Sequence, residues 1–326
     1  MRRFIALLGV PLLFIAACAR PDATGPGGPG GPGGAADQRR EVFERRADVV
    51  AEAWRTAAGR PQWQAGYAPL QSLTVLPADP GFTPETEQAF LAGWFRSAVP
   101  VPGDRPADGT VTFPDGTLTV PMISAADAYA AIDQGDPPPC PTDDPARPGP
   151  DPTGSISGGP DTSVTDSLPM TGCEGLTVTG VTLGTVELLT SRGTAQVPAW
   201  LFEVAELDTA VARVAVDDSV SIPTPSPQVA APDGLADFVV AQDLTGVDGS
   251  DLGFRLGVGA CDSEITPFVQ EYTDAVVVSG GVVRSGDACT DQLLLHPVTV
   301  TLDEPLGART VLDALTGAPL HVVTAG

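Results

Sequence analysis

Two segments rich in Pro and Gly limit where this chain can build a hydrophobic core. Residues Pro21 to Ala36 read PDATGPGGPGGPGGAA, and residues 136–172 consist mostly of Pro, Gly, Asp, Ser and Thr without a helix or strand period. Such segments contain few side chains that could be buried. The core must therefore come from the rest of the chain. The full sequence has a hydrophobic content of 42%, which is sufficient to build one.

The first residues have the composition of an export signal. Arg2 and Arg3 precede a nearly continuous apolar stretch from Phe4 to Ala17. A helix this short does not span roughly 30 Å of hydrocarbon, so residues 1–17 are predicted to be a secretory signal peptide rather than a membrane span. The Arg pair also suggests twin-arginine export, but the match is partial and general secretion is favoured.

The signal ends in IAAC, residues 15–18, which resembles the lipobox of bacterial lipoproteins. This resemblance implies that Cys18 receives diacylglycerol and becomes the first residue after cleavage. An ordinary signal peptide with an incidental Cys18 is the alternative. Acyl chains on Cys18 would hold the protein on the extracytoplasmic face of the cell membrane, with membrane lipid as its first partner. Residues 18–37 are then a flexible tether.

The charge of the chain excludes some partners. Its formal net charge is −24, and all 17 basic residues are Arg. Such an acidic surface repels phosphate backbones and anionic head groups, so no nucleic-acid partner is expected. The absence of Lys and Asn, whose codons are AT-rich, indicates a host with a GC-rich genome.

Helical patterns are concentrated in a first folded lobe, residues 38–222. Apolar side chains recur at three-, four- and seven-residue spacing over residues 38–59, which predicts an amphipathic helix that packs in a core or, alternatively, binds a partner. A second helix is expected to begin at Thr83 as N-cap with Pro84 in its first position, and a third runs from Ser124 to Ile132. The excursion of residues 136–172 within this lobe is expected to be a disordered loop.

Period-two patterns predict strands in both halves of the chain. Residues 110–121 read as a hairpin, and longer strands are expected at 176–190 and 195–204. A second Pro-rich segment, Pro223 to Gly234, is the expected boundary to a β-rich lobe of residues 235–326, with turns at residues 279–281 and 316–317. The predicted fold class is α+β, with an N-terminal lobe of about three helices and antiparallel hairpins and a sandwich-like or barrel-like C-terminal lobe.

Four cysteines other than Cys18 are expected to form disulfides, because the count is even and the chain is exported. Of the three possible connectivities, we favour Cys140 with Cys173 and Cys261 with Cys289, because each pair then lies within one lobe. No C-x-x-C is present, which argues against a zinc site.

No catalytic motif is recognisable. The chain has no G-x-S-x-G elbow, and its two histidines, His296 and His321, are interpreted as strand-edge residues. No phosphate-binding or dinucleotide-binding glycine motif appears, so no cofactor and no catalytic residue are assigned.

Two weaker sites remain as hypotheses. Asp243, Asp248 and Asp251 are closely spaced in a turn-rich segment and could ligate calcium, although they match a calcium loop poorly and a solvated turn is the alternative. Trp63 and Tyr67 lie in a predicted loop and could stack on a glycan, with core packing as the alternative.

The C-terminal segment from Val298 to Gly317 follows the pattern V-T-V-x-L-x-x-P-L-G-x-R-x-V-x-D-x-x-T-G. This pattern resembles the tails of uncharacterised actinobacterial lipoproteins, and residues Thr190 to Val204 are similar to an interior stretch of such chains. The resemblance carries no activity and no site residue. Its last part is expected to form a strand, a tight turn and a returning strand.

The sequence thus favours a membrane-anchored lipoprotein that acts as a non-catalytic binding or interaction module of the cell envelope, with a ligand or envelope partner still to be identified. An extracytoplasmic hydrolase using carboxylates is a second hypothesis, because 41 acidic residues provide many pairs. A transporter's solute-binding lipoprotein is a third, although such proteins alternate strands and helices in two lobes.

Overall fold

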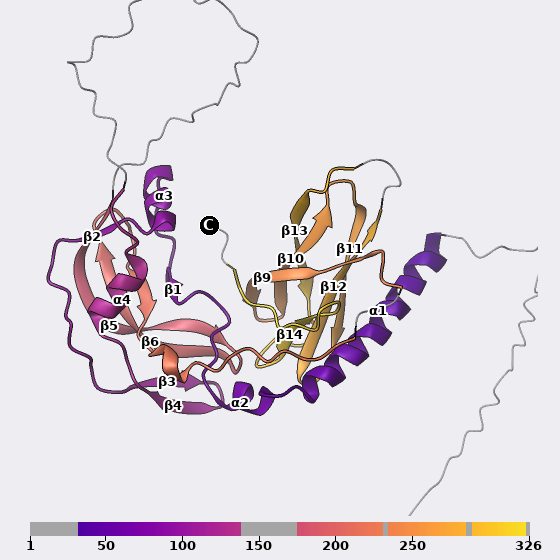
Figure 1. Cartoon of the computed structure of the whole chain (residues 1–326), viewed down its shortest axis with the longest axis horizontal. Coiled ribbons are helices and arrows are strands. Elements are labelled where there is room, and N and C mark those ends of the chain that lie inside the picture. Colours follow the sequence, from indigo (N-terminus) through magenta and orange to yellow (C-terminus); the bar gives the residue numbers. More distant parts are fainter. Residues whose placement is uncertain (1–31, 138–174, 231–233, 285–288, 324–326) are drawn as a thin grey trace, which may run out of the picture. The chain divides into compact units, whose positions relative to one another are not determined.

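The computed structural model describes residues 32–137, 175–230, 234–284 and 289–323 (Figure 1). From Arg39 onwards, the described residues form one compact unit. The described part has a mixed α+β fold that is mostly β, in which the strands form three sheets. Its helices are α1 (Pro32–Arg55), α2 (Arg60–Ala65), α3 (Pro84–Ala92) and α4 (Ala125–Ile132), with a 3₁₀ turn at Asp218–Val220.

The predicted helix starts are confirmed by their capping. Thr83 caps α3 with its side chain on the backbone N–H of Thr86, and Pro84 occupies the first position. Ser124 caps α4 in the same way, and the Asp127 carboxylate accepts from the Ser124 backbone in return. These reciprocal bonds satisfy backbone donors that a helix leaves free at its start.

The first sheet, here called the N-terminal sheet, contains seven strands. They are β1 (Thr74–Val75), β2 (Phe95–Ser97), β3 (Gly109–Phe113), β4 (Gly116–Val120), β5 (Leu176–Thr190), β6 (Gly193–Val204) and β7 (Val211–Val214). The antiparallel hairpin of β5 and β6 is its longest pairing, which confirms the strands expected at 176–190 and 195–204. Leu176 and Val178 are buried while Thr179 is exposed, as the alternation predicts.

The second half of the unit contains two further sheets. The strands are β8 (Phe238–Val239), β9 (Ala241–Asp248), β10 (Asp251–Gly259), β11 (Ser263–Glu271), β12 (Ala275–Val283), β13 (Leu293–Thr301) and β14 (Thr310–Asp313). β9, β10 and β13 form the outer sheet, and β8, β11, β12 and β14 form the helix-facing sheet. Leu252, Phe254 and Leu256 of β10 pack with Val276 and Val278 of β12, so the two sheets lie face to face.

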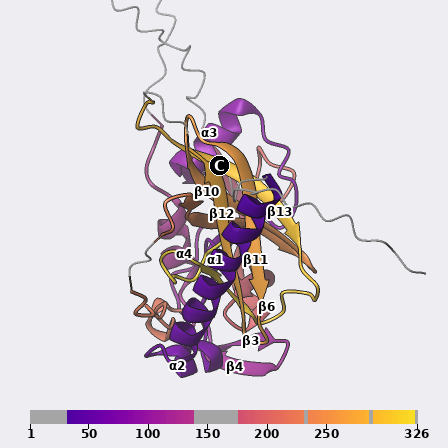
Figure 2. The ribbon, with the colours of Figure 1, turned by 90° about the vertical axis from the view of Figure 1, so that its right-hand side faces the viewer.

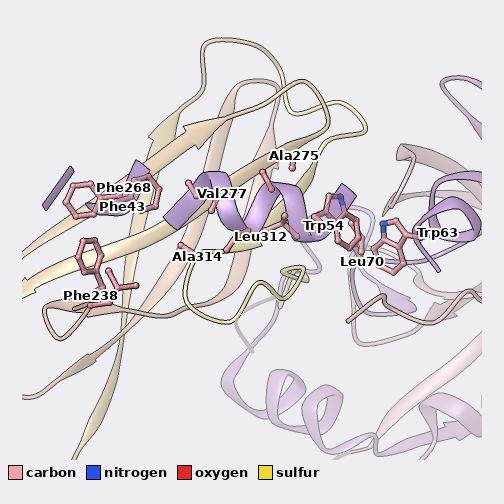
Figure 3. Packing of buried hydrophobic residues seen from close by; sticks show 14 of the residues in the cluster. Phe43, Trp54, Trp63, Leu70, Phe238, Phe268, Ala275, Val277, Leu312 and Ala314 are labelled. Atoms are coloured by element: carbon pink, nitrogen blue, oxygen red, sulfur yellow. The ribbon is translucent and has the colours of Figure 1, made fainter. Parts of the chain in front are cut away.

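Helix α1 covers the other face of the helix-facing sheet (Figures 1 and 2). Phe43 and Trp54 belong to one buried cluster with Ala275, Val277 and Leu312 (Figure 3). The sequence grouped this helix with the N-terminal lobe, but the structure packs it on the C-terminal strands. The reason is that β12 is apolar at successive positions and is therefore buried on both faces.

Two further expectations are corrected. Residues 279–281 lie inside β12 rather than in a turn. An added Cβ at Gly280 would lie 2.6 Å from Leu256 Cδ1, so glycine permits close packing there instead of reversing the chain. The returning strand of the C-terminal motif, β14, does not pair with β13 but pairs in parallel with β12 in the other sheet.

Candidate binding groove

Two cavities lie along the second half of β5 and share Glu187. One, of about 310 Å³, is lined by Gln71, Glu187, Leu188, Leu189, Thr194, Gly246, Val247 and Val322. The other, of about 470 Å³, is lined by Val75, Leu76, Pro77, Thr185, Val186, Glu187 and Gln196. The consecutive residues Thr185 to Leu189 all contribute, although side chains alternate between the faces of a strand. The two cavities, here called the β5 groove, therefore follow the edge of the strand rather than one face.

The hydrogen bonds of Leu189 show which backbone groups point to this edge. Leu189 lies opposite Thr194 of β6, yet its carbonyl accepts from the Leu70 N–H at 2.9 Å and its N–H donates to Gln71 Oε1 at 3.1 Å. Both groups therefore point away from β6. Because antiparallel pairs alternate, the backbone groups of Leu183, Thr185 and Glu187 point the same way.

A proline on β6 supports this assignment. Pro198 lies directly opposite Thr185. Because Pro has no N–H to donate, it fits a position where the two opposite residues exchange no backbone hydrogen bonds. The pairing of β5 and β6 is regular from Gly180 to Thr190, so the alternation continues without a shift.

The open part of the edge lies between two occupied ends. At one end, β2 pairs with Leu176–Val178, and the Ala98 N–H donates to the Val178 carbonyl. At the other end, Leu70 and Gln71 bond to Leu189. Within the described residues, no backbone partner is found for the edge-facing groups of Leu183, Thr185 and Glu187.

The side chains along the groove are uncharged except for Glu187. Its carboxylate accepts from Gln196 Nε2 at 3.1 Å. In the described ranges no Arg lies within 4.0 Å of it. Leu183, four positions earlier on the same face and next to the two cavities, is 46% exposed. The groove and the adjoining part of the β5 edge thus offer backbone donors and acceptors, one negative charge and an apolar contact.

The predicted glycan-stacking residues are not exposed to a ligand. Trp63 lies in α2 with 1% of its surface exposed and packs edge-on against Trp54, and Tyr67 is 2% exposed. Burial raises the pKa of the Tyr67 hydroxyl far above its usual range. The core-packing alternative therefore describes both residues.

Two of the three predicted calcium ligands bond to other side chains. Asp243 forms a two-point ion pair with Arg255 at 2.6 and 2.7 Å, and Asp251 accepts from the Thr301 hydroxyl at 2.8 Å. Asp248 lies opposite Asp251 in the backbone register of the β9–β10 hairpin. Among the described residues, no group of three potential metal ligands is found.

A disulfide joins Cys261 to Cys289, the pairing that the sequence favoured in the C-terminal half. It ties the start of β11 to the segment before β13. Cys18, Cys140 and Cys173 lie outside the described residues, so lipidation and the second disulfide remain predictions. No helix in the described ranges is long and apolar enough to cross a membrane.

The two histidines occupy different surroundings. His296 is exposed on β13, while the His321 ring lies 3.3 Å from the Thr224 hydroxyl, and burial lowers the pKa of His321. In the described structure, neither histidine forms an ion pair with a carboxylate.

Comparison of the chain with protein-family models, curated proteins and solved structures found no match. The assignment of the β5 groove as a candidate binding site therefore depends on its geometry. The sequence does not predict this groove; the related signal it contains is a strand-like run from 176 to 190 that is longer than the strands beside it.

Proposed function

We propose that this chain is a lipoprotein anchored through Cys18 on the extracytoplasmic face of the cell membrane, where it binds an envelope partner in the β5 groove without transforming it chemically. The observation that supports the binding role is the groove itself, in which unoccupied backbone groups of β5 line two adjoining cavities. The lipobox-like sequence before Cys18 and the Gly/Pro-rich segment after it support the anchor.

The hydrolase hypothesis ranks second, because it needs two carboxylates that face one cavity. The β5 groove has one, Glu187. The most deeply buried carboxylate described, Asp313, accepts hydrogen bonds from the backbone of Ala241, Leu315 and Thr316 and from the Thr316 hydroxyl. It holds together the turn after β14 and does not line the groove.

Photo-cross-linking in cells tests the binding role. A benzophenone amino acid at Thr185 would face the groove, and the same amino acid at Glu264, exposed on β11, serves as the control. We expect a discrete cross-linked product from position 185 that is absent from position 264. Equal products from both positions, or none from position 185, would contradict a partner in this groove.

Detergent phase separation tests the anchor independently. The wild-type chain is expected in the detergent phase, and Cys18→Ser is expected in the aqueous phase. Wild-type material without added acyl mass would remove the proposed anchor while leaving the groove in place.

A further inference from the structure

The open edge of β5 points to a specific way of binding. We infer that the groove accepts an extended segment of a partner protein as an added antiparallel or parallel strand, and that this segment carries an Arg or Lys opposite Glu187. This inference rests on the proposed binding function and specifies how it is carried out.

The backbone supports strand addition. The N–H and carbonyl groups of Leu183, Thr185 and Glu187 point away from β6, and they alternate at the spacing that an added strand requires. Exposed sheet edges of this kind pair readily with another chain. The protein itself uses the two ends of the same edge, since β2 pairs with Leu176–Val178 and Leu70 bonds to Leu189. The added strand would occupy the interval between them.

The side chains of the groove support the inference that the added strand carries a basic residue. Glu187 is the one charged residue that lines the groove, and its described polar contact is a neutral amide, Gln196 Nε2. An ammonium or guanidinium group would meet a carboxylate that has no cation among the described residues. The net charge of −24 would also attract a basic segment from a distance. Leu183 adds an apolar contact on the same face.

A substitution at Thr185 isolates the backbone contribution. Thr185→Pro removes an N–H that points into the groove but leaves the pairing with β6 intact, because Thr185 faces Pro198 across a pair without backbone hydrogen bonds. Thr185→Val changes the side chain but keeps the N–H and serves as the matched control. For the charge, Glu187→Gln is compared with Glu203→Gln, an exposed Glu on neighbouring β6.

The probe is a phage-displayed library of random dodecapeptides, selected on the full chain in detergent. We expect the selected peptides to be enriched in Arg or Lys and in β-branched residues. Their affinity should fall about tenfold with Thr185→Pro, the effect of losing a backbone hydrogen bond in a desolvated groove, and should be little changed by Thr185→Val. Glu187→Gln should weaken binding and reduce its salt dependence, while Glu203→Gln should not.

Selected peptides without basic residues, or peptides that bind Thr185→Pro as well as wild type, would overturn the inference while leaving the groove as a binding site. If Thr185→Pro does not fold, peptides N-methylated at alternate amides replace it. One register should lose binding and the other retain it, and equal behaviour of both registers would overturn strand addition. Selection of no peptide would also overturn it, and the cross-linking result at position 185 then decides separately whether the groove binds a partner of another kind.

Discussion

Phe43 of α1 stacks on Phe268 of β11 with ring centroids 5.3 Å apart and an angle of 25° between the ring planes. Both side chains are buried, and Phe238 of β8 lies against the same Phe268 ring. Removing the Phe43 ring would leave a cavity between the helix and the sheet. Phe43→Ala should therefore lower the free energy of unfolding by about 3–5 kcal/mol.

Chemical denaturation followed by circular dichroism measures this effect. Val49→Ala is the control, because Val49 is on the same helix but 52% exposed, and it should change stability by less than about 0.5 kcal/mol. Similar losses for both variants would contradict the packing of α1 on the helix-facing sheet.

Two adjacent arginines on α1 are expected to differ in their contribution to stability. Arg46 donates to the carbonyls of Ala314 at 2.7 Å, Leu315 at 2.8 Å and Ala230 at 3.0 Å, whereas Arg45 makes an exposed pair with Glu41 at 3.9 Å. Arg46→Met should cost about 1.5–3 kcal/mol, and Arg45→Met less than about 0.5 kcal/mol. Thermal and denaturant unfolding compare them directly, and a larger loss for Arg45→Met would be inconsistent with this contact.

Gly280 and Gly246 distinguish a glycine needed for close packing from one at an open position. A Cβ at Gly280 would meet Leu256 and Val239 at 2.6 and 2.7 Å, while a Cβ at Gly246 would meet nothing within 4 Å. Gly280→Ala should therefore destabilise the fold by about 1–3 kcal/mol, and Gly246→Ala should be near neutral. If residues 279–281 were a surface turn, the first substitution would be tolerated as well as the second.

Acid should weaken the fold partly through His321. Burial lowers the pKa of His321 below its ordinary value of 6.5, so the folded state binds a proton less readily than the unfolded state. The free energy of unfolding should then decrease as the pH falls from about 6.5 through the folded pKa, and level off below it.

Denaturant unfolding at a series of pH values measures this dependence. His321→Gln should remove part of the decrease, whereas substitution of the exposed His296 on β13 by Gln should leave it unchanged. An unchanged pH profile in His321→Gln would show that other groups cause the acid sensitivity.

The sequence predicted local structure well where a hydrophobic period was long. The alternation from Leu176 to Thr179 and the capping residues Thr83 and Ser124 are local signals, and the structure confirms both. A helix over residues 38–59 was also recognisable, because apolar side chains recur there at helical spacing, but α1 begins earlier, at Pro32 within the expected tether, and ends at Arg55. Its packing partner was not recognisable, since an amphipathic pattern shows that one face is buried without showing against which strands.

The Gly-Gly pair at residues 280–281 was also ambiguous in the sequence, because it is compatible with two different local structures. A Gly-Gly pair is typical of a turn, but it also occurs where two layers approach closely, and Gly280 and Gly281 belong to the second case. The groove could not be predicted, because its walls come from residues 71–77, 185–196, 246–247 and 322, which are distant in sequence. These segments come together only in the folded chain, where they surround a part of the β5 edge whose backbone groups have no described partner.

The placement of α1 also bears on how the protein is made. Arg46 and the turn that it holds at Ala314 are separated by 268 positions in the chain. During synthesis, the apolar side of this early helix therefore has no sheet to cover until nearly the last strand has emerged. Contacts this distant slow the final assembly step and leave Phe43 and Trp54 open to chaperones or to aggregation in the meantime. Shortening the chain at its C-terminal end should thus affect the helix at its beginning.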